Sequence, residues 1–265
     1  MSKIPENLGN PNNVPTEPVP SKEFADANLK PFQDVLQARR SIRIYDGERI
    51  PEETMREILS ETIQFSPSSS NLQPWEFYWV RSEDKRKALH EACLNQPAAK
   101  TAGEIIVCVT TPKLWKTRLD TLLGIMKKGS KDGELPKSVS YYYEKLIPTI
   151  HKDDPLGLNN IFRKAYFFKK GLKEPIVRSP TNQGDHRVWA HVQTALACQT
   201  LMLSFTAHGY DTCPMGGFDE VRVKKALNLS NEKEVCMVIS AGTRKPEGLY
   251  GPRVRVPDAD VIFEV

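Results

Sequence analysis

Apolar residues at helical spacing alternate with short apolar runs along residues 31–111 of the chain. The spacing predicts helices that begin near Pro31 and Pro51 and a third helix over 83–93, and uninterrupted apolar runs predict strands over 77–81 and 104–110. Because helices and strands follow one another, we expect a layered domain of the α/β or α+β class.

The N-terminal segment 1–30 has a different character. It contains five prolines, several asparagines and almost no apolar periodicity, so it cannot form a core of its own. We interpret it as an extended arm that lies on another surface, with a disordered tail as the alternative. The folded domain is therefore placed at 31–265.

Residues 112–188 carry three further amphipathic patterns, over 115–126, 139–150 and 158–165. Linkers that contain glycine and proline separate these patterns, which is typical of short helices joined by turns. The segment is predicted to be a helical insert within the domain.

Two features of this insert could be interpreted as functional sites. Its aromatic residues could stack on a planar molecule, and His151 with Asp153 and Asp154 could form a metal or acid/base cluster. We interpret most of the aromatic residues as helix packing, because they fall at helical spacing, and the His–Asp group as a solvated turn.

The longest helical pattern covers 189–208 and is apolar on nearly every face. Such a helix must be largely buried, either in the centre of the domain or between two subunits. Apolar runs over 235–240 and 260–265 predict two further strands.

Composition and charge narrow the possible functions. The 265 residues are 39% hydrophobic and 26% charged, and the net charge of +4 is modest. No Lys/Arg block is interleaved with aromatic residues, so we expect no nucleic acid partner. No apolar run is long enough for a membrane span and no secretory signal is evident, so we expect no membrane partner and a cytoplasmic protein.

The five cysteines are far apart and have no metal-ligand spacing, which favours buried free thiols and no metal site. The side chains also show no Ser/His/Asp or Cys/His arrangement and no phosphate-binding Walker loop. The protein therefore has no evident chemistry of its own.

Candidate binding chemistry first appears in the segment 66–75, Ser-Pro-Ser-Ser-Ser-Asn-Leu-Gln-Pro-Trp. Small hydroxyls and carboxamides on a loop held by two prolines present donors and acceptors in a fixed place. This is typical of a binding loop, although a polar connector has the same composition.

Arginine is concentrated in two short segments. Arg39, Arg40 and Arg43 surround Ser41, and Arg253 and Arg255 lie at i and i+2, on the same side of an extended chain. Guanidinium groups bind phosphate in bidentate fashion, but a solvated surface would show the same pattern. The clusters favour an anionic small molecule over a nucleic acid.

A pair of glycines, Gly216 and Gly217, precedes a helical pattern that Asp219 can cap. Without side chains, two glycines let the backbone come close to a planar ligand, although an ordinary turn also uses such a pair.

Four of these segments, in this order, resemble motifs of the nitroreductase family of flavin mononucleotide (FMN) enzymes. They are Arg39–Tyr45, Ser66–Trp75, the Pro-Met-Gly-Gly-Phe-Asp segment 214–219 and the Arg-Val-Arg segment 253–255. The resemblance covers about 31–111 and 189–265. It implies an α+β fold, an α/β sandwich of the nitroreductase-like type, with a central, mostly antiparallel mixed sheet flanked by helices.

The same resemblance implies a domain-swapped homodimer. The helix over 189–208 would lie at the dimer interface, and the C-terminal strand would pair with the partner's sheet. The insert 112–188 would cap the flavin and shape the substrate pocket.

The resemblance also assigns an FMN site, in which the arginines hold the phosphate and the Gly217 N–H faces flavin N5. The residues that it assigns to cofactor binding, some of them from the neighbouring subunit, are Arg39, Arg40, Ser41, Arg43, Pro67, Ser68, Ser69, Ser70, Asn71, Asn95, Pro214, Met215, Gly216, Gly217, Arg253 and Arg255. Ala98 stands where some members have a lysine near the flavin pyrimidine, which leaves open what stabilises charge on the reduced ring.

The implied activity is ping-pong electron transfer from NADH or NADPH, through FMN, to a nitroaromatic, quinone or similar small-molecule acceptor. Reductive dehalogenation, flavin destruction and non-enzymatic flavin binding stay open as alternatives.

Overall fold

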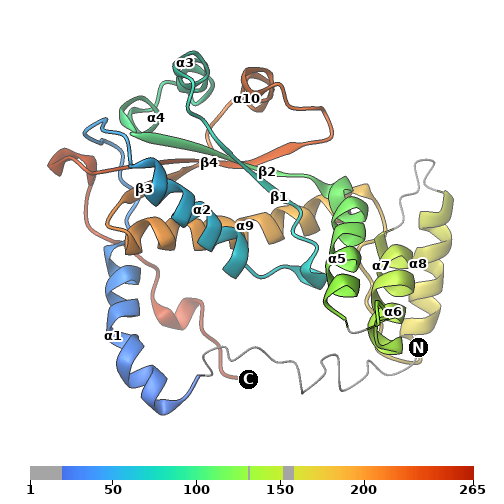
Figure 1. Ribbon diagram of the computed structural model, residues 1–265. Helices are drawn as coiled ribbons and strands as arrows, with labels where there is room; N and C mark the ends of the chain where they lie inside the picture. The colour runs from blue at the N-terminus through green and yellow to red at the C-terminus, as the bar shows by residue number, and fades with distance from the viewer. Residues whose placement is uncertain (1–19, 131, 152–157) are drawn as a thin grey trace.

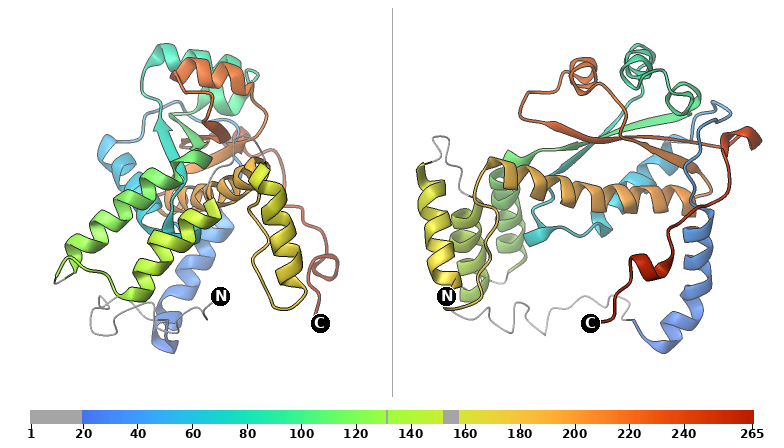
Figure 2. Two further views of the ribbon diagram at one scale, coloured as in Figure 1. Left: turned by 90° about the vertical axis from the view of Figure 1, so that its right-hand side faces the viewer. Right: turned by 180° about the vertical axis from the view of Figure 1, so that it is seen from behind.

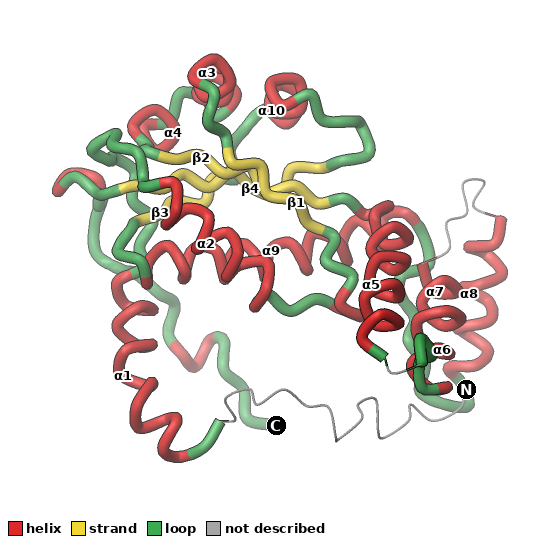
Figure 3. The backbone as a smooth tube through the Cα atoms, viewed as in Figure 1, coloured by secondary structure: helices red, strands yellow, loops and turns green. Residues whose placement is uncertain are grey.

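The computed structural model describes residues 20–130, 132–151 and 158–265 (Figure 1). Helices and one antiparallel sheet are combined, which confirms the predicted α+β class (Figure 3). The strands are β1 (Trp75–Trp79), β2 (Glu104–Thr110), β3 (Asp211–Met215) and β4 (Glu234–Gly242). The α-helices are α1 (Lys22–Ala38), α2 (Glu52–Phe65), α3 (Glu83–Ala92), α4 (Pro97–Thr101), α5 (Trp115–Gly129), α6 (Lys137–Tyr141), α7 (Ile147–His151), α8 (Leu158–Gly171), α9 (Gln183–Ala207) and α10 (Glu220–Leu227).

The sheet has the strand order β1-β2-β4-β3, and every ladder is antiparallel. Ser41 adds a parallel bridge to Thr212 at the β3 edge, so the sheet is mostly antiparallel, as expected. All seven residues of β2 are buried, because helices cover both faces of the sheet (Figure 2).

Successive side chains of β2 point to opposite faces of the sheet, so they pack in two different hydrophobic clusters. Ile105, Val107 and Val109 pack in the cluster that contains residues of α3 and α10. Ile106 and Cys108 pack in the cluster that contains residues of α2 and α9. The sheet is therefore the middle of three layers, which explains why β2 reads as an uninterrupted apolar run.

Helix α9 runs beneath the sheet (Figure 1) and buries one side against it, including Leu201 and Phe205. Its other side carries Val188, Val192 and Leu196, which are exposed at i, i+4 and i+8. One chain thus covers only half of this apolar helix.

The predicted extended arm is wrong for 22–30, which belong to α1. Ser21 caps this helix, since its hydroxyl oxygen accepts a hydrogen bond from Phe24 N at 3.1 Å. All five prolines of the predicted arm lie at or before position 20, so none of them opposes the helix. Pro31 lies inside α1 and removes one intrahelical hydrogen bond without ending it. Residues 1–19 lie outside the described part of the chain.

The predicted C-terminal strand is also not found in the single chain. A 3₁₀ turn over Asp258–Asp260 is followed by irregular backbone, and Val261, Ile262 and Phe263 are exposed. A strand needs a neighbour to supply hydrogen bonds, and in the described chain none lies beside this tail.

The insert is helical in the three places where amphipathic patterns predicted helices. The middle helical segment is not a regular α-helix along its whole length. The run from α6 to α7 passes through a π-helical turn, Tyr142–Leu146, directly before Pro148 and its missing N–H. Proline therefore alters this helix but does not end it at that point.

Four cysteines are buried, Cys236 is half-buried, and all five are free thiols, as expected. Among the described residues, no group of His, Cys, Asp and Glu side chains could hold a metal ion. None of the helices in the described ranges is both long and apolar enough to cross a bilayer.

The approach of Gly103 to the loop before α2 gives a test of the fold. A Cβ on Gly103 would lie 1.9 Å from the backbone oxygen of Glu48, which cannot move as a flexible side chain can. We expect Gly103→Ala to lower the free energy of unfolding by about 1–3 kcal/mol, measured by urea denaturation. As the control, Gly124→Ala in α5, where a Cβ meets open space, should raise it by about 0.5–1 kcal/mol. Equal effects of the two changes would contradict this packing.

Candidate functional site

The two arginine segments meet at one cavity of about 290 Å³. Its lining residues are Arg39, Arg40, Ser41, Arg43, Leu249, Tyr250, Gly251, Pro252, Arg253, Val254 and Arg255. The bridge from Ser41 to Thr212 and the hydrogen bond from Arg43 N to Gly248 O (2.9 Å) fix the first segment along the β3 edge. The fold thus brings together Ser41 and all five arginines that were predicted to bind the cofactor.

Backbone carbonyls orient these arginines. Arg253 Nη2 donates to the carbonyl oxygens of Gln37 and Arg39, each at 3.0 Å. Arg40 Nη2 donates to Gly251 O at 2.6 Å, which ties the segments together across 211 positions. The Arg43 guanidinium lies over the Tyr250 ring, 5.1 Å from its centroid.

The positive charge of this cavity is not neutralised. Within the described residues, none of its five arginines forms an ion pair with a carboxylate, whereas Arg244 nearby is paired with Asp211. Burial lowers the pKa of the Arg39 guanidinium, and repulsion from Arg253 and Arg255 lowers it further. A cluster of mutually repelling guanidiniums favours a bound anion and fits a phosphate.

Asn95 and Gly217 belong to two loops that Gln96 fastens together. Gln96 Nε2 donates to Gly217 O at 2.7 Å and to Cys93 O at 3.0 Å. Asp219 N donates to Ala92 O at 2.7 Å and adds a second connection. Asn95 is held in a left-handed turn with a φ of 55°. The sequence prediction missed Gln96, and no motif pointed to it.

The Gly217 N–H meets no acceptor in the described part of the chain. A Cβ on Gly216 would meet nothing within 4 Å, whereas one on Gly217 would lie 3.5 Å from Gln96 Nε2, so the open space lies beside Gly216. An unpaired N–H beside open space fits a planar ligand with a hydrogen-bond acceptor at its edge. Met215 is 3% exposed and its side chain packs in the core, so this side chain does not line the open space.

Strand β3 connects the two parts of this half-site. Thr212 bridges Ser41 beside the arginine cavity, and the strand then runs through Pro214 and Met215 to the glycine pair. Burial raises the pKa of the Cys213 thiol on this strand, although Arg43 and Arg39 act in the opposite direction. Such a thiol is a poor nucleophile, so it supplies no alternative covalent chemistry.

The loop around Ser68–Asn71 is a tight turn with unusual backbone. Ser70, Asn71 and Gln73 all have φ near +50°, at 54°, 54° and 44°, and Gln73 N donates to Ser68 Oγ at 3.1 Å. Ser69 N donates to Gln193 Oε1 on α9 at 2.8 Å. Pro67 precedes the turn and is exposed.

One chain does not bring this loop to the arginine cavity. The loop is fastened to Gln193, whereas the arginines adjoin β3, which follows the C-terminal end of α9 (Figure 1). From Gln193 to Ala207 alone the helix rises about 21 Å at 1.5 Å per residue. The predicted site residues therefore form two groups, one beside the middle of α9 and one near its C-terminal end.

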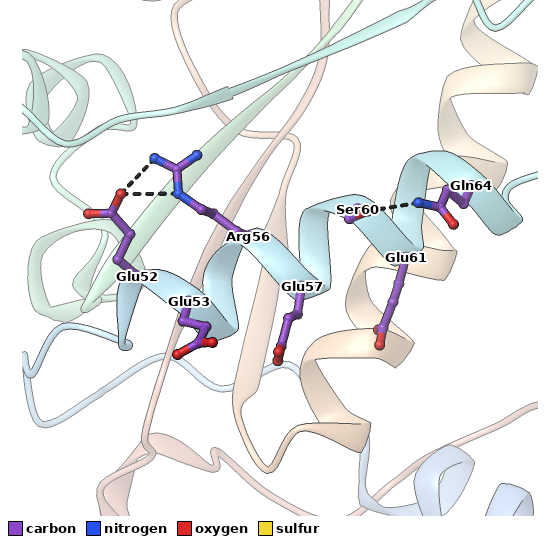
Figure 4. Close-up of a pocket in the computed structure, with 7 residues that line it drawn as sticks. All are labelled: Glu52, Glu53, Arg56, Glu57, Ser60, Glu61 and Gln64. Carbon is purple, nitrogen blue, oxygen red and sulfur yellow. Dashed lines mark hydrogen bonds and ion pairs between the residues drawn. The ribbon is translucent and has the colours of Figure 1, made fainter.

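A larger hollow, of about 750 Å³, contains none of the predicted site residues (Figure 4). Its lining comes from the outer side of α2 and includes Glu52, Glu53, Glu57 and Glu61. Four carboxylates repel an anion, so this surface is not the phosphate site.

His151 is 4% exposed, so the interpretation of a solvated turn is wrong for this residue. Its ring centroid lies 4.7 Å from that of Trp189 and 5.6 Å from that of Trp115, where the insert meets α9. The surrounding apolar residues bury the polar ring. Asp153 and Asp154 lie outside the described residues. The prediction that aromatic residues of the insert pack its helices together is confirmed for Trp115, Tyr142 and Tyr143, which pack against a small core.

Comparison with known proteins adds independent information. The nitroreductase family model matches residues 36–243. The protein YdgI of Bacillus subtilis, assigned as an NAD(P)H nitroreductase, is 29% identical over 228 residues, which are 85% of this chain and 94% of YdgI. Nitroreductase NfnB of Mycolicibacterium smegmatis is 28% identical over 239 residues, 86% of this chain and 88% of NfnB. A crystal structure from Exiguobacterium sibiricum, of a protein assigned as a nitroreductase in complex with FMN, superposes with a TM-score of 0.65 and 27% identity, covering 88% of this chain and 97% of that one.

The role of Gln96 can be tested by changing a single group. Gln96→Glu places a carboxylate against the carbonyls of Gly217 and Cys93, so both hydrogen bonds are lost. We expect the free energy of unfolding to fall by about 1–2 kcal/mol and amide exchange of 214–219 to accelerate. The control Gln64→Glu, at an exposed site on α2, should change stability by no more than a few tenths of a kcal/mol. Unchanged exchange over 214–219 in the Gln96 variant would show that this residue does not hold the loop.

Proposed function

The chain belongs to the nitroreductase family, and from this premise we propose that it is an FMN-dependent NAD(P)H oxidoreductase with nitroreductase activity. The observation that carries the proposal is the cavity of five arginines, which have no carboxylate partner among the described residues. Strand β3 joins this cavity to the Gly217 N–H, for which the described residues offer no acceptor. The known FMN complex of the Exiguobacterium sibiricum relative supports it.

The residues present fit FMN at both of its ends. Arg39, Arg43, Arg253 and Arg255 would hold the phosphate, with Arg40 and the Ser41 hydroxyl beside them. The backbone of 214–217 would face the flavin ring. The Gly217 N–H would donate to N5, and Asn95, fixed by the adjoining turn, would reach the ring edge.

When bound, FMN supplies the redox chemistry, taking two electrons from NADH or NADPH and passing them to a nitroaromatic, quinone or similar acceptor in a ping-pong cycle. The chain's own residues bind the phosphate, orient the ring and exclude water. A backbone donor beside N5 stabilises electron density at that atom, because it is fixed in place before the reaction.

A homodimer would complete the site. Pro67 and Ser68–Asn71 would reach the flavin of the partner, because their own arginine cavity lies near the C-terminal end of α9. The exposed side of α9, with Val188, Val192 and Leu196, is an apolar surface that a second copy would cover. The exposed C-terminal tail, including Ile262 and Phe263, would gain a strand partner by crossing to that copy.

The insert 112–188 would cap the flavin and shape the acceptor pocket. Its exposed aromatic residues, Tyr141, Tyr166 and Phe168, offer apolar surface suited to a planar acceptor. Trp115 and Tyr142 instead pack against the small core that the insert forms with Leu72.

A visible absorption spectrum of the purified protein, repeated anaerobically after adding NADH or NADPH, tests this function. We expect a flavin spectrum that bleaches with one of the two donors and returns when a quinone is added. A protein that cannot be reconstituted with FMN would overturn the proposal. A flavin that is not reduced would indicate a non-enzymatic flavoprotein.

The phosphate site can be tested by removing two of its cations. Arg253→Ala with Arg255→Ala should weaken FMN binding by about 100-fold or more, since each charged hydrogen bond contributes about 1.5–3 kcal/mol. Fluorescence titration with FMN measures this change, and size-exclusion chromatography should show an unchanged dimer. The control is Arg56→Ala with Arg81→Ala, which removes the same charge from two exposed arginines paired with Glu52. FMN retained by both double variants would contradict the assignment.

A further inference from the structure

We propose that Tyr142, in the insert, is a positioning residue for the loop Ser68–Asn71. Its hydroxyl holds Ser70 in a left-handed backbone conformation, so the insert shapes the cofactor loop as well as covering the substrate pocket. The proposal rests on the proposed function, because only that function makes this loop a cofactor loop.

The contact that carries the inference joins two segments 72 positions apart. Ser70 Oγ and the Tyr142 hydroxyl oxygen are 2.8 Å apart in a partly buried setting. Ser70 has φ of 54° and ψ of 20°, a region that residues with a side chain rarely adopt without a local restraint. A hydrogen bond to its side chain is such a restraint.

Neighbouring loop residues are anchored from outside as well. Ser69 N donates to Gln193 of α9 at 2.8 Å. The Leu72 side chain is fully buried in a small core with Leu119 and Ile147 of the insert, and Tyr142 packs against the same core. Two of the three anchors therefore come from the insert. The loop's internal hydrogen bonds, such as Gln73 N to Ser68 Oγ, close the turn but leave its position relative to the domain unset.

The backbone at Tyr142 is itself irregular. Tyr142 is the first residue of the π-helical turn that ends at Leu146, between α6 and α7. Single π-helical turns occur mostly inside α-helices and frequently at functional sites. Here the turn lies where the insert meets the loop.

Tyr143 provides a matched control. It lies in the same π-helical turn, packs against the same core, and its ring meets that of Tyr142 edge-on at 5.0 Å. Its hydroxyl has no hydrogen-bond partner among the described residues. Removing one hydroxyl at either position therefore changes the same small core by the same atom, but only Tyr142→Phe breaks a contact with Ser70.

The experiment compares Tyr142→Phe, Tyr143→Phe and wild type in two measurements. Fluorescence titration of the flavin-free protein gives the Kd for FMN, and hydrogen–deuterium exchange of the same protein gives the protection of 66–74. We expect Tyr142→Phe to raise the Kd about threefold to tenfold, the effect of one lost hydrogen bond, and to accelerate exchange in 66–74 alone. Tyr143→Phe should match wild type in both measurements.

Ser70→Gly separates positioning from general stability. Glycine adopts positive φ without strain, so Tyr142→Phe should have no further effect on the Kd in the Ser70→Gly background. The proposal is overturned if Tyr142→Phe leaves both measurements unchanged, if Tyr143→Phe has an equal effect, or if Tyr142→Phe loses the same factor in both backgrounds. If wild type binds no FMN, the proposed function fails, and the exchange of 66–74 still decides whether Tyr142 orders the loop.

Discussion

The complete burial of β2 is the constraint on which the architecture depends. A strand with apolar side chains on both faces must be covered on both, which requires α3 and α10 on one side and α2 and α9 on the other. With β2 and β4 in the middle, β3 becomes an edge strand. That free edge accepts Ser41, and so the arginine segment is carried to the place where the C-terminal arginines also arrive.

The cavity shows how a fold can hold like charges together without neutralising them. Arg253 and Arg40 are oriented by carbonyl oxygens, which accept hydrogen bonds but carry no formal charge. Several arginines elsewhere in the chain are paired with carboxylates, as Arg49 is with the buried Glu104 and Arg244 with Asp211. The geometry of the cluster is therefore fixed while no described carboxylate neutralises its charge, an arrangement that would be preorganised for an anion.

The local sequence was sufficient to predict an element or a motif where its pattern allowed only one interpretation. The bounds of β2 follow from an uninterrupted apolar run, and the arginine and glycine motifs could be found from their spacing. The local sequence did not predict the structure correctly where tertiary contacts determine whether a segment forms a strand. Strand β3 contains Asp211 and Pro214 and is a strand only because β4 lies beside it, and residues 261–265 have no such neighbour in one chain. Gln96 and Tyr142 belong to no motif, since their roles arise from carbonyl and hydroxyl groups distant in sequence.

The π-helical turn restricts how the insert can change during evolution. Each residue added to or removed from a regular helix turns everything beyond it by about 100°, so a single deletion within α6 would carry the Tyr142 hydroxyl away from Ser70. Length changes in the loops that join the insert's helices leave that rotation untouched. The linkers of the insert can therefore change in length without moving this hydroxyl, whereas the winding of this one helix and the position of the serine loop that it contacts are constrained together.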